Sequence, residues 1–253
     1  MKVSALKKNV KAGFTLIELM VVIAILASMA VIGGNAYLSH MKDGDRQVAQ
    51  SNLQSVHKIL GQFKADQTCY PCDSTAEKLQ EEKPDLNFGE LTGEYSNNYF
   101  RQVFYSAANE SEKPFFAKLA VAGKATKEAD ERVANGAALS KGENGMSYVL
   151  RKSTDDPNRK EAVTRLNAPL AFCSLYPSDT PYSGDNMVFD MSSYDGQALV
   201  LFSDGSVKNL KDSLEEDDAD EAKGTLQKGK DVFPATKKGR DIAGDYYVLT
   251  PDL

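Results

Sequence analysis

The chain has 253 residues, of which 42% are hydrophobic and 26% are charged, a composition that is ordinary for a globular protein and excludes a largely disordered one. Its net charge is −6, but four lysines and no acid lie in the first 13 residues, so the remainder carries −10. An acidic body argues against nucleic acid as a partner, because phosphate contacts require clustered Lys and Arg side chains.

The N-terminal segment begins with a basic stretch that ends at Gly13 and continues as an apolar run from Phe14 to Ile32. As a helix, these 19 residues would be long enough to span a bilayer core of roughly 30 Å. The lysines before the run place the leader in the cytoplasm and the body outside it, by the positive-inside rule. The sequence therefore predicts that this segment inserts into membrane lipid.

One acidic residue, Glu18, interrupts the apolar run. A charge at the centre of a membrane-spanning helix costs roughly 2.5–3.5 kcal/mol on the lenient insertion scale, so an ordinary anchor would favour Leu there. An acid in such a run indicates a functional site that supplies the carboxylate with a partner.

The stretch Lys11-Ala12-Gly13-Phe14-Thr15-Leu16-Ile17-Glu18-Leu19 resembles the class III signal of type IV pilins and of type II secretion pseudopilins. The resemblance implies a prepilin peptidase that cuts after Gly13 and N-methylates the new first residue, Phe14. It also implies that Glu18 pairs with the free amine of a neighbouring subunit as the apolar helices pack into a filament. Filament growth would require an inner-membrane assembly platform and a cytoplasmic ATPase.

A general secretory signal peptide is the alternative interpretation of the same segment. Ser28-Met29-Ala30 has small residues at the spacing that signal peptidase prefers, and cleavage before Val31 would release a soluble binding protein or enzyme. This alternative leaves Glu18 without a purpose.

The helix is expected to continue beyond the apolar run as an amphipathic segment. Apolar residues recur there at the 3.6-residue spacing of a helix face, namely Leu53, Val56, Leu60 and Phe63. We therefore divide the chain into a leader (1–13), an apolar helix for the membrane or the filament core (14–35), its amphipathic continuation (36–66) and a globular head (67–253). The predicted fold is α+β, with the long N-terminal helix packed on a small antiparallel sheet.

Three cysteines, Cys69, Cys72 and Cys173, allow one disulfide in an exported body, and their spacing does not settle the pairing. A redox Cys-x-x-Cys normally opens a helix after a strand, whereas this one closes a predicted helix, and Pro71 favours a turn. A structural role is therefore the better interpretation.

The stretch from Cys69 to about Asn144 is expected to be rich in loops, with helical pieces near 99–108 and 115–122. Strand signals come later, and they cover residues 146–150, 187–189, 197–202 and 246–250. Residues 201–208 predict a hairpin around Asp204-Gly205 and are similar to a C-terminal hairpin of major pilin-like proteins. The acidic run 215–221 favours a surface insertion over 211–240.

No catalytic site is predicted. His40 and His57 have no Cys or carboxylate at the spacing of a ligand set or a triad, so surface or packing roles are favoured. Residues 224–230 resemble a phosphate-binding loop, but Asp231 stands where Ser or Thr is required. The resemblance to major pseudopilins, which bind Ca²⁺ in a C-terminal loop, would implicate Asp179, Asp185 and Asp190 as oxygen ligands. Turn chemistry is the favoured explanation of these aspartates, and no metal or cofactor is predicted.

The sequence thus predicts a structural subunit of a filament rather than an enzyme. The precursor would insert in the inner membrane and end in a pilus or pseudopilus, at the cell surface or in the periplasm. A pilus-like subunit is favoured slightly over a pseudopilin, because the body is large for a major pseudopilin.

Overall fold

The structure is a computed structural model, and it describes residues 14–106, 109–121, 124–131, 133, 136, 138–184, 186–228, 230–233 and 243–253, with only the backbone for 30–36, 120 and 124. The predicted leader, including Gly13, lies outside these residues. The chain divides into two compact units, Met1–Met41 and Lys42–Leu253.

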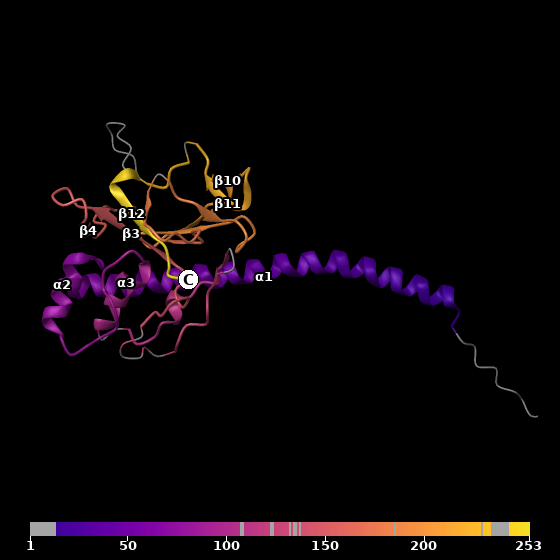
Figure 1. Cartoon of the computed structure of the whole chain (residues 1–253), viewed down its shortest axis with the longest axis horizontal. Coiled ribbons are helices and arrows are strands. Elements are labelled where there is room, and N and C mark those ends of the chain that lie inside the picture. Colours follow the sequence, from indigo (N-terminus) through magenta and orange to yellow (C-terminus); the bar gives the residue numbers. More distant parts are fainter. Residues whose placement is uncertain are drawn as a thin grey trace, which may run out of the picture. The chain divides into compact units, whose positions relative to one another are not determined.

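The helices are α1 (Leu16–Gln67), α2 (Asp73–Glu82) and α3 (Ser96–Phe100), with 3-10 turns η1 (Arg101–Tyr105), η2 (Lys113–Phe115), η3 (Lys211–Ser213) and η4 (Ala243–Asp245). The strands are β1 (Ala120–Val121), β2 (Lys124–Ala125), β3 (Ser147–Lys152), β4 (Lys160–Glu161), β5 (Pro169–Cys173), β6 (Tyr182–Ser183), β7 (Phe189–Asp190), β8 (Leu199–Phe202), β9 (Val207–Asn209), β10 (Leu214–Asp217), β11 (Asp220–Leu226) and β12 (Tyr246–Leu249). This content confirms the α+β class, and the arrangement is drawn in Figure 1.

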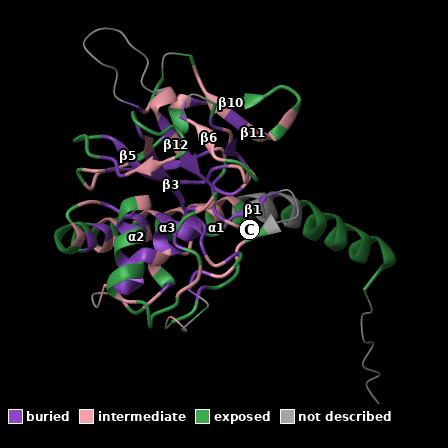
Figure 2. Ribbon diagram, turned by 60° about the vertical axis from the view of Figure 1, so that its left-hand side comes forward, coloured by how far each residue is buried: buried purple, intermediate pink, exposed green. Residues whose placement is uncertain are grey.

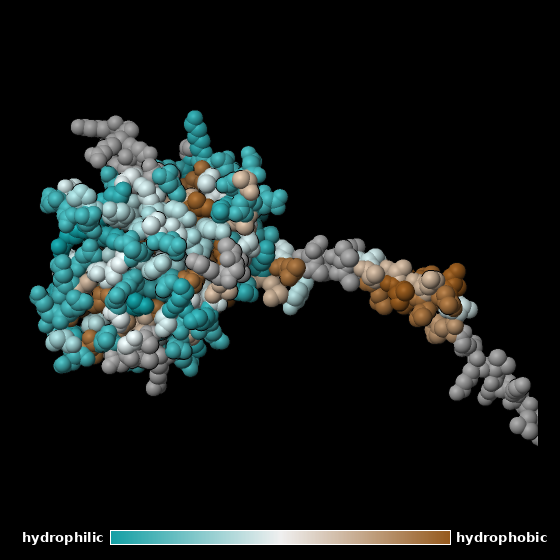
Figure 3. All heavy atoms as spheres, in the orientation of Figure 1, coloured by the Kyte–Doolittle hydropathy of each residue, from teal (hydrophilic) through white to brown (hydrophobic). Residues whose placement is uncertain are grey.

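In the first unit, the described turns of α1 expose large apolar side chains. Their exposed fractions run from 42% at Met41 to 75% at Leu16, and Phe14, just before the helix, is 86% exposed. Figure 3 shows these hydrophobic side chains gathered along the N-terminal turns of the helix. Among the described residues, no helix combines the length and the hydropathy that a membrane span requires. The span predicted for 14–35 includes residues 30–35, whose side chains lie outside the described part of the chain.

In the second unit, α1 buries the face that the sequence predicts. The core side chains of this face are between 0% and 1% exposed, and they are Ala49, Leu53, Val56, Leu60 and Phe63. Burial of each large apolar side chain contributes roughly 1.5–3 kcal/mol, so this stripe anchors the helix in its own unit. Figures 1 and 2 show the helices of this unit in one layer and the main sheet in another.

The main sheet is antiparallel, with strand order β6-β12-β3-β5-β8-β9, and β4 pairs with the C-terminal end of β3. The strands predicted over 146–150, 197–202 and 246–250 are confirmed as β3, β8 and β12. The central strand β5 is not among the predicted strands, although all five of its residues are buried. The strand predicted at 187–189 is present only as β7, from Phe189.

Three expectations for the head are wrong. The stretch after Cys69 forms α2 rather than a loop, and the helix expected over 115–122 is replaced by η2 and β1. The segment 211–240 is not simply an insertion, because β10 and β11 form a hairpin that pairs with β7. Acidic side chains are tolerated there because they point into solvent while the backbone completes the ladder.

The predicted hairpin around Asp204-Gly205 is confirmed as β8 and β9. Gly205 has a φ of +84°, and a Cβ at this position would lie 2.8 Å from Cε1 of His57 on α1. The Nε2 atom of His57 lies 3.3 Å from the Ser203 carbonyl oxygen. His57 therefore packs between α1 and the hairpin, which is the packing role expected from the sequence.

The neighbours Leu60 and Gly61 test the buried stripe of α1. Leu60→Ala should lower the free energy of unfolding by about 2–5 kcal/mol, because it leaves a cavity in the core. Gly61→Ala should raise it by about 0.5–1 kcal/mol, since the added methyl group meets no atom within 4 Å and reduces backbone freedom. Urea unfolding of the full chain in detergent measures both. Equal effects of the two substitutions would contradict the packing described here.

Candidate functional site

Helix α1 begins with a capping box at the apolar N-terminal segment. Thr15 precedes the first helical residue, and its backbone N–H donates to Glu18 Oε2 at 2.8 Å. The Thr15 hydroxyl donates to the same oxygen at 2.8 Å, while its oxygen accepts the Glu18 N–H at 3.3 Å. The pattern Thr-x-x-Glu is a capping signature that satisfies two orphan N–H groups of a helix start.

This capping box gives Glu18 a local role in the single chain. The carboxylate lies at the positive end of the helix dipole, where a negative charge is stabilised. Both hydrogen bonds that the carboxylate accepts from Thr15 reach Oε2, which leaves Oε1 for a further donor. Phe14, the residue before the box, is 86% exposed. The sequence predicts a role for Glu18 but not its bonds to Thr15, although the Thr-x-x-Glu spacing is the signal that could have predicted them.

The Cys-x-x-Cys turn connects α1 to α2. The Sγ atoms of Cys69 and Cys72 lie 3.9 Å apart, and Cys72 is the N-cap residue of α2. Burial raises the pKa of the Cys69 thiol to about 11, and the neighbouring Cys72 adds to the rise. A thiol with a raised pKa is a poor nucleophile, which argues against a redox site. The third cysteine, Cys173, is fully buried in β5.

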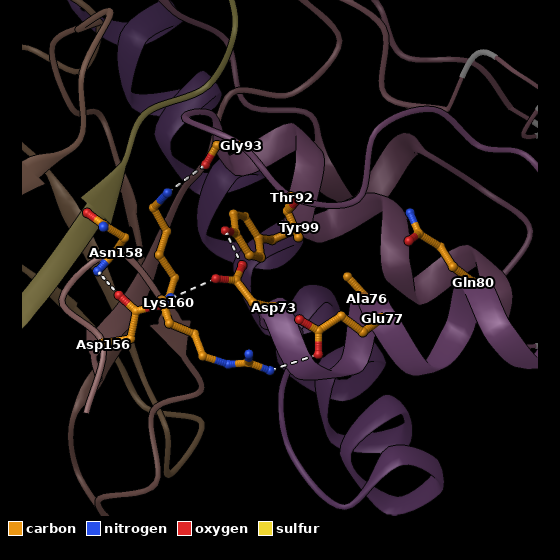
Figure 4. A pocket seen from close by; sticks show the side chains of 11 residues that line it. Asp73, Ala76, Glu77, Gln80, Thr92, Gly93, Tyr99, Asp156, Asn158 and Lys160 are labelled. Carbon is orange, nitrogen blue, oxygen red and sulfur yellow. Dashed lines mark hydrogen bonds and ion pairs between the residues drawn. The ribbon is translucent and has the colours of Figure 1, made fainter. Parts of the chain in front are cut away.

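The hollow in Figure 4, of about 450 Å³, lies between α2 and β4. Asp73 accepts hydrogen bonds from the Tyr99 hydroxyl at 2.7 Å and from the Lys160 backbone N–H at 2.7 Å. Arg159 pairs with Glu77 at 2.8 Å. These polar groups bond to one another across the hollow, so the arrangement joins the helix to the strand and offers no poised acid, base or nucleophile.

The aspartates that the sequence suggests as Ca²⁺ ligands do not form a cluster among the described residues. Asp185 lies outside them, and Asp179 is exposed. Asp190 is buried, and its carboxylate accepts bonds from the Ser192 N–H at 2.9 Å, the Ser192 hydroxyl at 2.6 Å and the Ser193 hydroxyl. Asp190 thus serves the turn after β7, as turn chemistry alone predicts.

Comparison with known proteins bears on the N-terminal segment. The family model described as the prokaryotic N-terminal methylation motif matches residues 8–34. The type II secretion system core protein G of Pectobacterium carotovorum subsp. carotovorum is 36% identical over 74 residues, which are 29% of this chain and 47% of that protein. These matches relate the N-terminal part of the chain to the type IV pilin and pseudopilin family. No solved structure matched the chain.

The matches cover the N-terminal segment and a limited part of the remainder of the chain. The chain spans about half the length of the curated relative it matches. The family is one of structural subunits and in general is not enzymatic.

We propose that Cys69 and Cys72, whose Sγ atoms lie 3.9 Å apart, form a disulfide when the chain is exported. The two thiols would lose two protons and two electrons to a disulfide oxidant of the exported compartment, and Cys173 would stay reduced in the core. Thiol alkylation of the denatured protein, purified without reductant and read by peptide mass, should label Cys173 alone. After reduction all three should be labelled. Labelling of Cys69 and Cys72 before reduction would contradict the pairing.

Proposed function

We propose that the chain is a subunit of a helical, pilus-like filament. The precursor inserts in the inner membrane, a prepilin peptidase cleaves it between Gly13 and Phe14 and methylates Phe14, and an assembly platform adds it to the filament. The observation that carries this proposal is the methylation motif over residues 8–34, continued by a helix whose apolar side chains are exposed. On this account the chain is not an enzyme.

The exposed apolar surface supports a partner for the first half of α1. Contiguous apolar patches beyond a few hundred Å² are rare on monomeric soluble proteins and mark interaction or membrane sites. Large apolar side chains more than half exposed continue over several turns and include Leu16, Ile17, Leu19, Met20, Ile23, Leu26 and Met29. Lipid covers this surface before assembly, and the same helix of other copies covers it afterwards.

Glu18 supports the assembly step. Burial of the helix among other helices would leave its charge in apolar surroundings, which is costly without a cationic partner. The capping bonds to Thr15 satisfy Oε2 but contribute no positive charge. A free α-amine at Phe14 of a neighbouring subunit supplies both a donor and the missing charge. The local cap holds the carboxylate in place for that amine.

A pseudopilin of type II secretion is the second candidate. The similarity to core protein G favours it, whereas the size of the head favours a pilus. Deletion in the native host separates the two. Loss of sheared surface filaments with intact protein secretion supports a pilus subunit, and loss of secretion with no surface filament supports a pseudopilin.

Two substitutions at Glu18 separate a local role from an intersubunit role. Glu18→Gln keeps the capping box, since Gln serves at the same position, but removes the charge. Glu18→Ala removes both. If the charge pairs with a neighbouring amine, both variants should insert in the membrane normally and both should lose filaments in a shearing assay. Thr15→Val removes the hydroxyl of the cap and keeps the charge, so it should retain filaments.

Normal filaments from Glu18→Gln alone would show that the cap is sufficient and would overturn the ion pair. Normal filaments from both Glu18 variants would remove any assembly role for this residue. Immunoblots of membrane fractions confirm in each case that the subunit is present at the level of the unsubstituted protein.

A further inference from the structure

Three acidic side chains converge in the irregular part of the head, away from the N-terminal segment. Glu112 directly precedes η2, Asp130 follows β2, and Glu143 lies in the turn before β3. One carboxylate oxygen from each lies within 4.8 Å of one from each of the others. The three residues are far apart in sequence, so the fold has to bring them together.

Glu112 is the unusual member of this group. It is 0% exposed, and neither of its carboxylate oxygens has a hydrogen-bond partner among the described residues. An unpaired charge inside a protein is costly, and buried carboxylates normally accept several hydrogen bonds. The buried Asp190 shows the usual solution, with bonds from Ser192 and Ser193. Glu112 therefore requires a proton or a cation that the protein side chains do not supply.

The nearby cationic side chains are committed elsewhere. Arg101 donates to the carbonyl oxygens of Ala138 at 2.7 Å, Leu139 at 3.1 Å and Glu90 at 3.3 Å. Lys113 pairs with Glu131 at 3.0 Å, and Lys141 pairs with Asp252 at 3.3 Å. The two lysines thus have their own carboxylate partners, and Arg101, whose charge acts on Glu112 and Glu143, donates its hydrogen bonds to backbone carbonyl oxygens.

The surroundings also resist a charged Glu112. The Glu112 carboxylate is fully buried, and the Glu143 and Asp130 carboxylates that lie beside it repel its negative charge. A bound cation would reverse this balance, because it pairs with all three carboxylates at once.

We propose that Glu112, Asp130 and Glu143 bind a calcium ion. The donors are oxygens alone, which suits a hard cation and not zinc. Oxygens within 4.8 Å of one another fit around one ion at the Ca²⁺–oxygen distance of about 2.4 Å, and Ca²⁺ is favoured over Mg²⁺ because Mg²⁺ usually keeps several waters instead of binding to a set of protein carboxylates. Because Asp130 is exposed, water can complete the coordination. The ion would hold together three loops that have little regular structure.

Calorimetric titration of the full chain in detergent, after treatment with EGTA, tests this site with CaCl₂ as the ligand. One ion should bind per chain, and the thermal unfolding midpoint should rise with calcium and stay unchanged with equal MgCl₂. Glu112→Gln removes the buried charge and keeps the shape, so it should fold without calcium and bind it at least about tenfold more weakly. Glu131→Gln changes a neighbouring exposed acid outside the group and should bind calcium like the unsubstituted chain.

Asp130→Asn, at the exposed member, provides an independent variant that leaves the core untouched, and it should weaken binding in the same way. Absence of a calcium response in the unsubstituted chain would overturn the proposal and assign Glu112 a proton instead. Unchanged calcium affinity in Glu112→Gln or in Asp130→Asn would place any bound ion elsewhere and would equally overturn it. Filament formation does not enter this test, so its outcome is independent of the proposed function.

Discussion

Helix α1 carries two apolar surfaces that differ in their partners. From Lys42 onward the helix buries a narrow stripe, centred on Leu53, Val56 and Leu60, in the core of its own unit. Over its first turns the apolar side chains surround the helix and remain exposed. A helix that is apolar on all sides is stable only when lipid or other helices enclose it. The head can therefore fold on the second half, while the first half needs partners from outside the chain.

The capping box at Thr15 and Glu18 gives the acid in the apolar run a role within its own chain. The sequence alone suggests that the carboxylate pairs with a group of another subunit. The structure adds a partner in the same chain, since Thr15 donates twice to one oxygen. A local cap lowers the cost of the polar helix start, but it does not neutralise the charge. The two roles are compatible, because the cap orients the group that the neighbouring amine would meet.

Sequence patterns predicted the features that local periodicity controls. The stripe of α1 and the hairpin at Asp204-Gly205 follow from helical spacing and from turn chemistry, and both are present. The strand β5 is not predicted from the sequence because Pro169 begins it and its five residues are all buried. No alternation of apolar and polar residues therefore marks it. The acidic residues of β10 and β11 favour a surface insertion in the sequence, because the pairing of this hairpin with β7 is a long-range contact that no local pattern indicates.

The group of Glu112, Asp130 and Glu143 could not be predicted at all, because loops of irregular conformation bring its members together. The prediction of Gly13 and Phe14 as the processing site depends instead on a short linear motif, and the match over residues 8–34 supports that motif.

The central claim is thus that the N-terminal motif is processed. Intact mass and N-terminal sequencing of the protein from its native host test that claim most directly. A chain that begins at N-methylated Phe14 is the expected result, and a chain that begins at Val31 would contradict the filament account.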